Sequence, residues 1–303
     1  MFNLNFIIMK KLMLCAAALM IGAIGFAQNT STVTQTGDLQ VADVIQVGSN
    51  TAVVTQNQEG IPDNDPAYTN KAYVNQLGFY NNAVVSQHDE GTHGEGYNDT
   101  RLWQNGNYND SYQVTISPDW NGGVEVNAWQ TGNYNDVVQV IYSGYTDDFY
   151  IYQYGDRHKA TQLGTGITTN TARIYQYNSD NTATQNLFGS NNGFYGGVYA
   201  NERILIEQYG TWNNATQTFT GIGWSHGNTA DIFQNGYNNY ANQYGTGRDL
   251  YADFNQIGNS NSATSYQDGE RLQVFINQTG NSNNAISTQI GIDNLVTINQ
   301  NSL

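Results

Sequence analysis

Polar and apolar side chains alternate along most of the chain, in register with a recurring Gln. Two residues before this Gln the side chain is apolar, whereas one residue before it the side chain varies. Successive residues of a β-strand point to opposite faces, so the alternation predicts strands that bury one face. The apolar positions are Val74, Leu102, Ala128, Ile151, Ile174, Ile206, Ile232, Phe254 and Ile276.

The recurring Gln belongs to a longer repeat. Its full form is Q-x-G-x-x-N-x-A-x-x-x-Q, with the two Gln 11 residues apart, as in 76–87, 256–267 and 278–289. In the middle of the chain the spacing is nine residues, as in 104–113, and we expect those units to be two residues shorter. A change of two residues preserves the face of a strand, so the closing Gln should still point the same way as the Ala.

Each unit predicts a strand, a tight turn and a second strand. Gly and Asn between the strands are expected to supply positive φ angles. Two strands cannot bury their inner face alone, but parallel stacking of the units can, with backbones about 4.7–4.8 Å apart. The expected fold is an all-β parallel β-solenoid of stacked strand-turn-strand repeats forming two facing sheets. Loop insertions should project from one edge, and they cover 57–70, 88–98, 117–123, 188–201 and 218–227.

The Gln and Asn of the repeat have a structural reason to recur. Identical amides in stacked units lie above one another and bond, which offsets the cost of burying them. A terminal unit can offer the same amides to another molecule, so these residues are the candidate self-assembly ladder. The candidates are Gln76, Asn81, Gln87, Gln256, Asn261, Gln267, Gln278, Asn283, Gln289, Asn294 and Gln300.

Residues 1–27 have the features of a secretory signal peptide. Lys10 and Lys11 precede an apolar run that ends in Gly25-Phe26-Ala27, and the run is too short for a membrane span. Cleavage there would remove Cys15, the one cysteine, and leave residues 28–303 as a single repeat domain without thiol chemistry. The chain has 25 acidic against 10 basic residues, which argues against nucleic acid and anionic membranes as partners.

Chemical sites are few. His88-Asp89-Glu90 with His93 lies in a Gly-rich insertion and is expected to be a solvated loop rather than a metal site. Asp63-Asn64-Asp65 and Asp147-Asp148 lack the full ligand spacing of a calcium loop. Arg157-His158 is expected in a turn, facing water. No Ser/His/Asp arrangement or phosphate loop is evident, so we expect no catalytic site, metal or cofactor. Trp103 and Trp129 are expected to stack in an aromatic ladder, with glycan binding as the alternative.

The spaced Gln, Gly, Asn, Ala and Gln of 76–87, 256–267 and 278–289 resemble the curlin repeat of bacterial curli fibre subunits. This resemblance covers most of residues 30–301. It implies a flat two-sheet β-solenoid that is exported to the cell surface and polymerises into amyloid fibres of the biofilm matrix, used in adhesion and aggregation. It also implies a nucleator subunit and an outer-membrane secretion channel as partners, besides the chain itself.

The alternative is a monomeric cell-surface β-solenoid, either an adhesin or a glycan-binding protein. An enzyme on such a fold would need Asp clustered with Lys or Arg, and the basic residues are scattered here. A monomer would also need capped ends. The last repeat runs to Gln300 without a Pro or a charged cap after it, so self-assembly is the expected behaviour.

Overall fold

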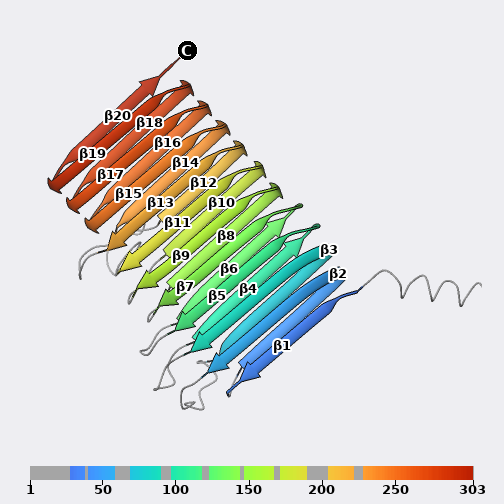
Figure 1. The fold of residues 1–303 in the computed structure, drawn as a ribbon. Coiled ribbons are helices and arrows are strands. Elements are labelled where there is room, and N and C mark those ends of the chain that lie inside the picture. Colours follow the sequence, from blue (N-terminus) through green and yellow to red (C-terminus); the bar gives the residue numbers. More distant parts are fainter. Residues whose placement is uncertain are drawn as a thin grey trace, which may run out of the picture.

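The computed structural model describes residues 28–302, apart from 38–39, 59–68, 90–96, 118–122, 144–146, 167–170, 190–203 and 222–227. The described residues form 20 β-strands and no helix, stacked in one elongated array (Figure 1). The expected all-β parallel β-solenoid is confirmed. The expected signal peptide, the insertion prolines, Glu90 and His93 lie outside the described residues.

Two sheets of parallel strands run the length of the array. The first sheet begins with the first halves of β2 (Gln40–Gln58) and β3 (Asn70–Asp89), which pair with each other. It continues through β4 (Tyr97–Asn105), β6 (Gly123–Thr131), β8 (Asp147–Asp156), β10 (Thr171–Ser179), β12 (Ile204–Thr211), β14 (Thr229–Tyr237), β16 (Tyr251–Asn259), β18 (Gln273–Asn281) and β20 (Leu295–Asn301).

The second sheet lies across the core from the first. It begins with β1 (Thr30–Thr36), which pairs with the second half of β2, and the second half of β3 follows. It continues through β5 (Asp110–Ser117), β7 (Asp136–Ser143), β9 (Lys159–Gly166), β11 (Thr182–Gly189), β13 (Asn214–Gly221), β15 (Tyr240–Arg248), β17 (Ser262–Glu270) and β19 (Asn284–Ile292).

We call a first-sheet strand with the second-sheet strand that follows it a rung, and the turn between them an arch. β2 and β3 each run through their arch and so contribute a whole rung. The insertions all connect a second-sheet strand to the next first-sheet strand. Because the strands of each sheet are parallel, these connections start and finish at one edge of the stack, opposite the arches, as expected.

The main core lies between the sheets. All the apolar residues two positions before the recurring Gln are buried in it, as the alternation predicts. From the second sheet they meet the Ala of the repeat, for example Ala83, Ala215 and Ala263, each fully buried. Each large apolar side chain buried here contributes about 1.5–3 kcal/mol.

The units with nine-residue Gln spacing are not shorter, contrary to the expectation. β3 and β5 pair without a shift of register, with Asn82 beside Asp110 and Val85 beside Gln113. The arch and strand therefore keep their length, and the closing Gln lies one inward position nearer the arch. Apolar side chains occupy the inward position that it leaves, namely Ile141, Leu187 and Phe219.

These apolar residues belong to a second core that the alternation did not predict. It fills the end of the rungs away from the arches and includes Phe149 and Phe219. Gly164 and Gly245 make room for the two rings, since a Cβ on them would lie 2.7 Å from Phe149 and 2.5 Å from Phe219. Along this column of paired inward positions, Ile141, Leu187 and Phe219 carry large side chains, whereas Gly164 and Gly245 have none and leave room for the neighbouring rings.

The arches explain the Gly of the repeat but correct the expectation for the Asn. Gly258 has a φ of 117°, and a Cβ there would lie 2.0 Å from the carbonyl oxygen of Gly280 in the next rung. The second positive φ belongs to the residue before the motif Asn, as at Ser260 (55°) and Tyr80 (60°). The Asn contributes its side chain rather than a positive φ.

Candidate functional site

The first sheet carries an unbroken ladder of Gln side chains. Each donates from Nε2 to Oε1 of the Gln in the next rung, over distances of 2.7–3.1 Å. All donors point toward the C-terminal end of the stack, so the ladder has a polarity. Its members are Gln46, Gln76, Gln104, Gln130, Gln153, Gln176, Gln208, Gln234, Gln256, Gln278 and Gln300.

The same amides also tie the two sheets together. Gln153 donates to the carbonyl of Asp136 at 3.0 Å, and Gln278 donates to the carbonyl of Ser262 at 2.9 Å. Both protons of each amide are thereby bonded although Gln153 and Gln278 are each only 1% exposed. A buried amide without these partners would destabilise the fold, so the ladder also favours the register that places one Gln beside the next.

The second sheet carries its Gln ladder in three segments. One joins Gln35, Gln56 and Gln87, and another joins Gln267 to Gln289. Between them a ladder runs one inward position nearer the arch, through Gln113, Gln139, Gln162, Gln185, Gln217 and Gln243. The spacing of nine residues in the middle units therefore means that their closing Gln lies in a different column, one inward position nearer the arch than in the end units.

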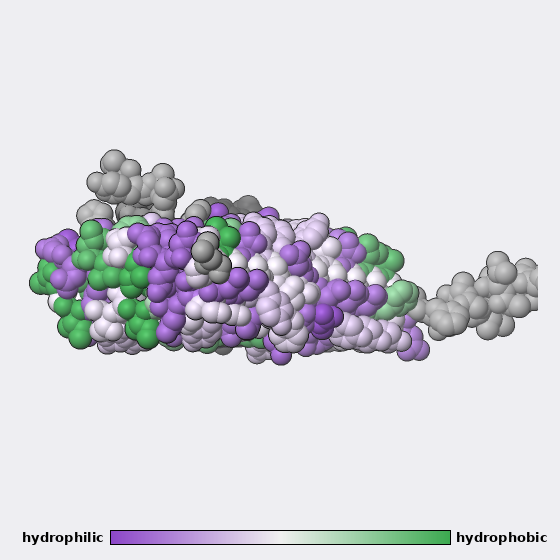
Figure 2. Space-filling model, turned by 90° about the horizontal axis from the view of Figure 1, so that it is seen from above, coloured by the Kyte–Doolittle hydropathy of each residue, from purple (hydrophilic) through white to green (hydrophobic). Residues whose placement is uncertain are grey.

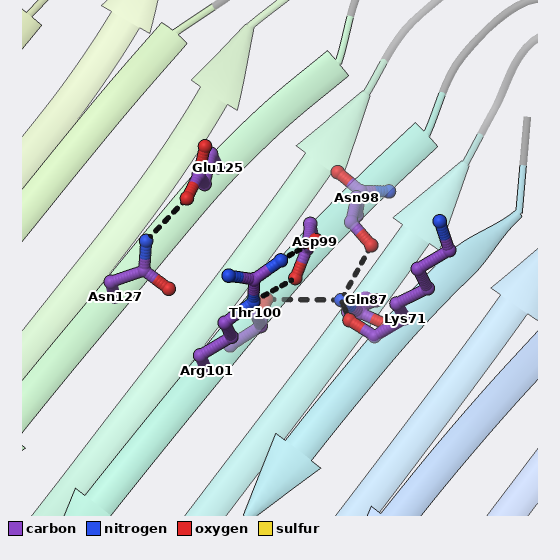
Figure 3. Close-up of polar contacts among 8 residues, drawn as sticks. All are labelled: Lys71, Gln87, Asn98, Asp99, Thr100, Arg101, Glu125 and Asn127. Carbon is purple, nitrogen blue, oxygen red and sulfur yellow. Dashed lines mark hydrogen bonds and ion pairs between the residues drawn. The ribbon is translucent and has the colours of Figure 1, made fainter. Parts of the chain in front are cut away.

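Other groups close the ladder where it changes column. At the first change Gln87 lies beside Thr115 instead of a Gln. Its Nε2 donates to the carbonyls of Lys71 and Asn98, at 2.7 and 2.9 Å, as Gln56 does to Val41 and Asn70, and Oγ1 of Thr100 at 3.0 Å replaces the missing Gln (Figure 3). On the far side of the change, Oε1 of Gln113 is buried without a partner among the described residues. Each change of column therefore leaves a local cost.

A third ladder runs along the arches and uses the motif Asn. Oδ1 of Asn239 accepts the backbone N–H of Asn261 at 3.0 Å, and Oδ1 of Asn261 accepts that of Asn283 at 3.0 Å. The Nδ2 group of Asn261 donates to the carbonyl of Gly280 at 3.0 Å. Asn29, ahead of β1, has the same place, because its Oδ1 accepts the N–H of Asn50 at 3.0 Å.

His158 takes the place of an Asn in this ladder, which corrects the expectation that it faces water. It is fully buried, whereas its neighbour Arg157 is exposed and pairs with Asp180 at 2.6 Å. Nδ1 of His158 accepts the N–H of Asn181, so the proton of the neutral ring is on Nε2, which donates to the carbonyl of Tyr154. Burial lowers the pKa of His158, against the raising effects of the Tyr154 carbonyl and of Asp180 and Asp156.

Acid should therefore weaken the stack at His158. Its pKa is lower in the folded than in the unfolded chain, so the unfolded chain binds more protons as the pH falls below about 6.5. The free energy of unfolding should then fall by at most about 1.4 kcal/mol per pH unit from this group. We expect His158→Asn, which restores the ladder, to lose less stability than the parent between pH 7.5 and pH 5 in urea unfolding. Equal losses in both proteins would contradict this.

Aromatic side chains form ladders on the outer faces. The rings of Trp103 and Trp129 stack with centroids 5.0 Å apart, and Tyr152 and Tyr175 extend the column at 4.6 and 4.9 Å. The expected aromatic stacking at Trp103 and Trp129 is confirmed. A second column of exposed rings follows the arches, formed by Tyr80, Tyr108 and Tyr134.

The structure places the predicted ladder residues in more than one column. Gln76, Gln256, Gln278 and Gln300 lie in the first-sheet ladder, and Gln87, Gln267 and Gln289 lie in the second-sheet segments. Asn81, Asn261 and Asn283 lie in the arch ladder. Asn294 is apart from these, because it lies between β19 and β20, at the edge opposite the arches.

The rest of the described surface offers few alternatives. Among the described residues, no group of three or more His, Cys, Asp or Glu is placed to hold a metal ion. His88 lies within 3.0 Å of Asn57, measured from Nδ1 to Nδ2. In the described part of the chain, no helix is long and apolar enough to cross a membrane.

Comparison with known proteins adds no family to this picture. No protein-family model matches the chain, and no curated protein matches it in sequence.

Proposed function

We propose that the chain is a secreted structural subunit that self-assembles end to end into extracellular amyloid fibres of a biofilm matrix. The observation that carries the proposal is that the first-sheet Gln ladder runs through the whole stack and reaches β20, and the arch ladder likewise extends from Asn29 to Asn283. Ala42 and Val44 in β2, with Val296 and Ile298 in β20, pack on the core but are only partly buried. Another rung laid on either end would bury them.

The surface chemistry of the ends supports this assembly. The space-filling view has apolar surface gathered at both ends of the stack, with polar surface between them (Figure 2). At the C-terminal end Ile286, Ile290 and Leu295 are 68%, 69% and 63% exposed. Strand edges that combine apolar side chains with free backbone groups pair readily with other strands, and such head-to-tail contacts build open filaments.

The proposed export and partners rest on features of the sequence. The signal peptide in residues 1–27 would direct the chain out of the cell, and the curlin-like repeat makes a nucleator subunit and an outer-membrane channel the expected partners. The acidic surface suits a chain that must stay dispersed during export, since net charge keeps proteins soluble. On this proposal the protein is not an enzyme and needs no cofactor.

The second candidate is a monomeric cell-surface adhesin that binds glycans. Its support is the exposed column of Tyr80, Tyr108 and Tyr134, which are 61%, 47% and 57% exposed. Exposed tyrosines combine apolar ring surface with a hydroxyl group, which suits contact with sugars. However, stacking of these rings on each other is itself stabilising, by about 0.5–1.5 kcal/mol a pair, so the column has a role without a ligand.

The purified chain from Gln28 onward should form fibres that bind thioflavin. Because the strands stack along the array and the two sheets face each other, fibre diffraction should give reflections at about 4.7 and 10 Å. The measurement is electron microscopy with diffraction on protein purified in denaturant and then diluted. A chain that stays monomeric for days at high concentration, and binds oligosaccharides, would favour the adhesin instead.

A further inference from the structure

The two ends of the described stack are stepped in opposite ways. At one end β1 extends the second sheet, and no described strand lies beyond the first half of β2 in the first sheet. At the other end β20 extends the first sheet, and no described strand lies beyond β19 in the second. Each end is therefore half a rung, and the two halves belong to opposite sheets.

We propose that β20 of one copy and β1 of the next copy form a single shared rung. β20 supplies its first-sheet half and β1 supplies its second-sheet half, so the two steps interlock. In this joint β20 pairs with the first half of β2 of the next copy, and β19 pairs with β1 of the next copy. The inference rests on the proposed self-assembly and specifies the surface that performs it.

The first-sheet contact has a unique register if the Gln ladder continues through it. Gln300 then lies beside Gln46 of the next copy, as Gln278 lies beside Gln300 within one chain. In the same register Val296 meets Ala42 and Ile298 meets Val44. These are the four residues that pack on the main core while remaining only partly buried in the single copy.

The second-sheet contact follows the same rule. With Gln289 beside Gln35 of the next copy, Ala285 meets Ser31 on the inner face. Gly291 then meets Gly37, as Gly269 meets Gly291 within one chain. Gly37 has the positive φ of this column, 101° against 112° for Gly291. A Cβ on Gly291 meets only Nδ2 of Asn294, at 3.8 Å, in the single copy, whereas a Cβ on Gly247 or Gly269 of the same column would lie 1.8 Å from a carbonyl oxygen of the next rung.

The polarity of the ladders allows only head-to-tail contact. At the C-terminal end, Nε2 of Gln300 is the ladder donor that faces outward. In the single copy it donates to the carbonyl of Asn284. At the N-terminal end Nε2 of Gln46 donates inward to Gln76, and Oε1 of Gln46 is the ladder acceptor that faces outward. Donor therefore meets acceptor in the joint. The arch ladder has the same polarity at Asn29, because Oδ1 of Asn29 accepts the backbone N–H of Asn50.

Cysteine pairs test this register in the full chain from Gln28, which has no cysteine of its own. Thr297→Cys with Asp43→Cys places one cysteine on each side of the first-sheet contact, on exposed outer positions. Ile286→Cys with Thr32→Cys does the same for the second sheet. Opposed residues of neighbouring strands lie within disulfide reach, so oxidation of fibres should give disulfide-linked multimers on denaturing gels for both pairs.

The matched control moves one cysteine two residues along the same face. Thr297→Cys with Ile45→Cys separates the two Cα atoms by roughly 8 Å, beyond the reach of a disulfide, so few multimers should form. Fibres in which the control pair links as well as the Thr297–Asp43 pair would overturn the register. Fibres in which the Ile286–Thr32 pair fails to link would overturn the shared rung. Absence of fibres from the unsubstituted chain would instead refute the proposed function.

Deletion of the half-rungs gives a second, independent test. Removing β1 alone or β20 alone leaves one empty strand position at every joint, and elongation should slow by about ten-fold or more. Removing both leaves flat ends, on which β18 and β19 can pair with the two halves of β2. The double deletion should therefore elongate faster than either single deletion. Additive slowing in the double deletion, with native circular dichroism in all variants, would refute the interlocking joint.

Discussion

Gly258→Ala is expected to prevent the chain from forming a complete stack. The new Cβ would lie 2.0 Å from the carbonyl oxygen of Gly280, on backbone that cannot move without breaking the β16–β18 pairing. The positive φ of 117° adds strain of about 1–3 kcal/mol for a non-glycine residue. The steric contact and the backbone strain together should lower the free energy of unfolding by more than about 4 kcal/mol, which is the range of the most disruptive substitutions.

The measurement is the urea midpoint of the soluble chain by circular dichroism, together with its resistance to protease. Gly291→Ala is the matched control, because it has a similar φ of 112° but no backbone atom of its own chain near the new Cβ. It should keep most of the stability of the single copy. If the two variants lose the same stability, strain in φ rather than contact between rungs explains the Gly of the repeat.

Gly291→Ala has a different expected effect in the fibre. In the shared rung Gly291 lies beside Gly37 of the next copy, so the new Cβ would meet the joint rather than its own chain. The variant should fold but elongate slowly, whereas Gly258→Ala should fail before assembly. This separation of folding from assembly is available at Gly291 because it is the last Gly of its column among the described residues.

The double change Gln162→Ala with Gln185→Ala is expected to be the other large perturbation. Both side chains are fully buried, and they bond to each other at 2.8 Å within the second-sheet ladder. Their loss leaves Gln139 without an acceptor in the ladder and Gln217 without a donor. Each buried polar group left without a partner costs about 1–3 kcal/mol, so the free energy of unfolding should fall by several kcal/mol.

The paired variant is Gln289→Ala with Gln300→Ala at the C-terminal end. There each Gln has one ladder neighbour in its own chain, Gln267 or Gln278, and the other side faces the joint. Stability of the single copy should fall less than in the inner pair, while elongation slows several-fold. Urea unfolding and thioflavin kinetics on the two double variants measure both effects. Equal elongation rates would mean that the end residues have no special role.

The sequence by itself determined the class of fold and the composition of its ladders. Alternation before each Gln, as at Val74 and Gln76, is a local property of strands, so it predicted which side chains face the core. The recurrence of Gln and Asn predicted stacked amides, because identical units must stack to bury their inner face. The role of the Gly was also predictable, because the positive φ that it supplies is required within the arch itself.

Only the tertiary structure decided which column each residue joins. The nine-residue spacing was consistent with a shorter unit, and pairing with β3 was needed to place Gln113 one position nearer the arch. His158 stands five residues after Gln153, as Asn81 does after Gln76, so the spacing alone was enough to predict its place in the arch ladder. Its burial was shown only by the structure. Asn294 fits the repeat motif yet lies at the opposite edge.

The half-rungs at the two ends were likewise settled by the structure. A run of units does not say which half of a rung comes first, since every strand of this repeat looks alike in its alternation. Pairing assigns β1 to the second sheet and β20 to the first. The physical reason is common to all these cases: periodicity is set within a strand, whereas register and column are set by contacts between residues more than twenty positions apart.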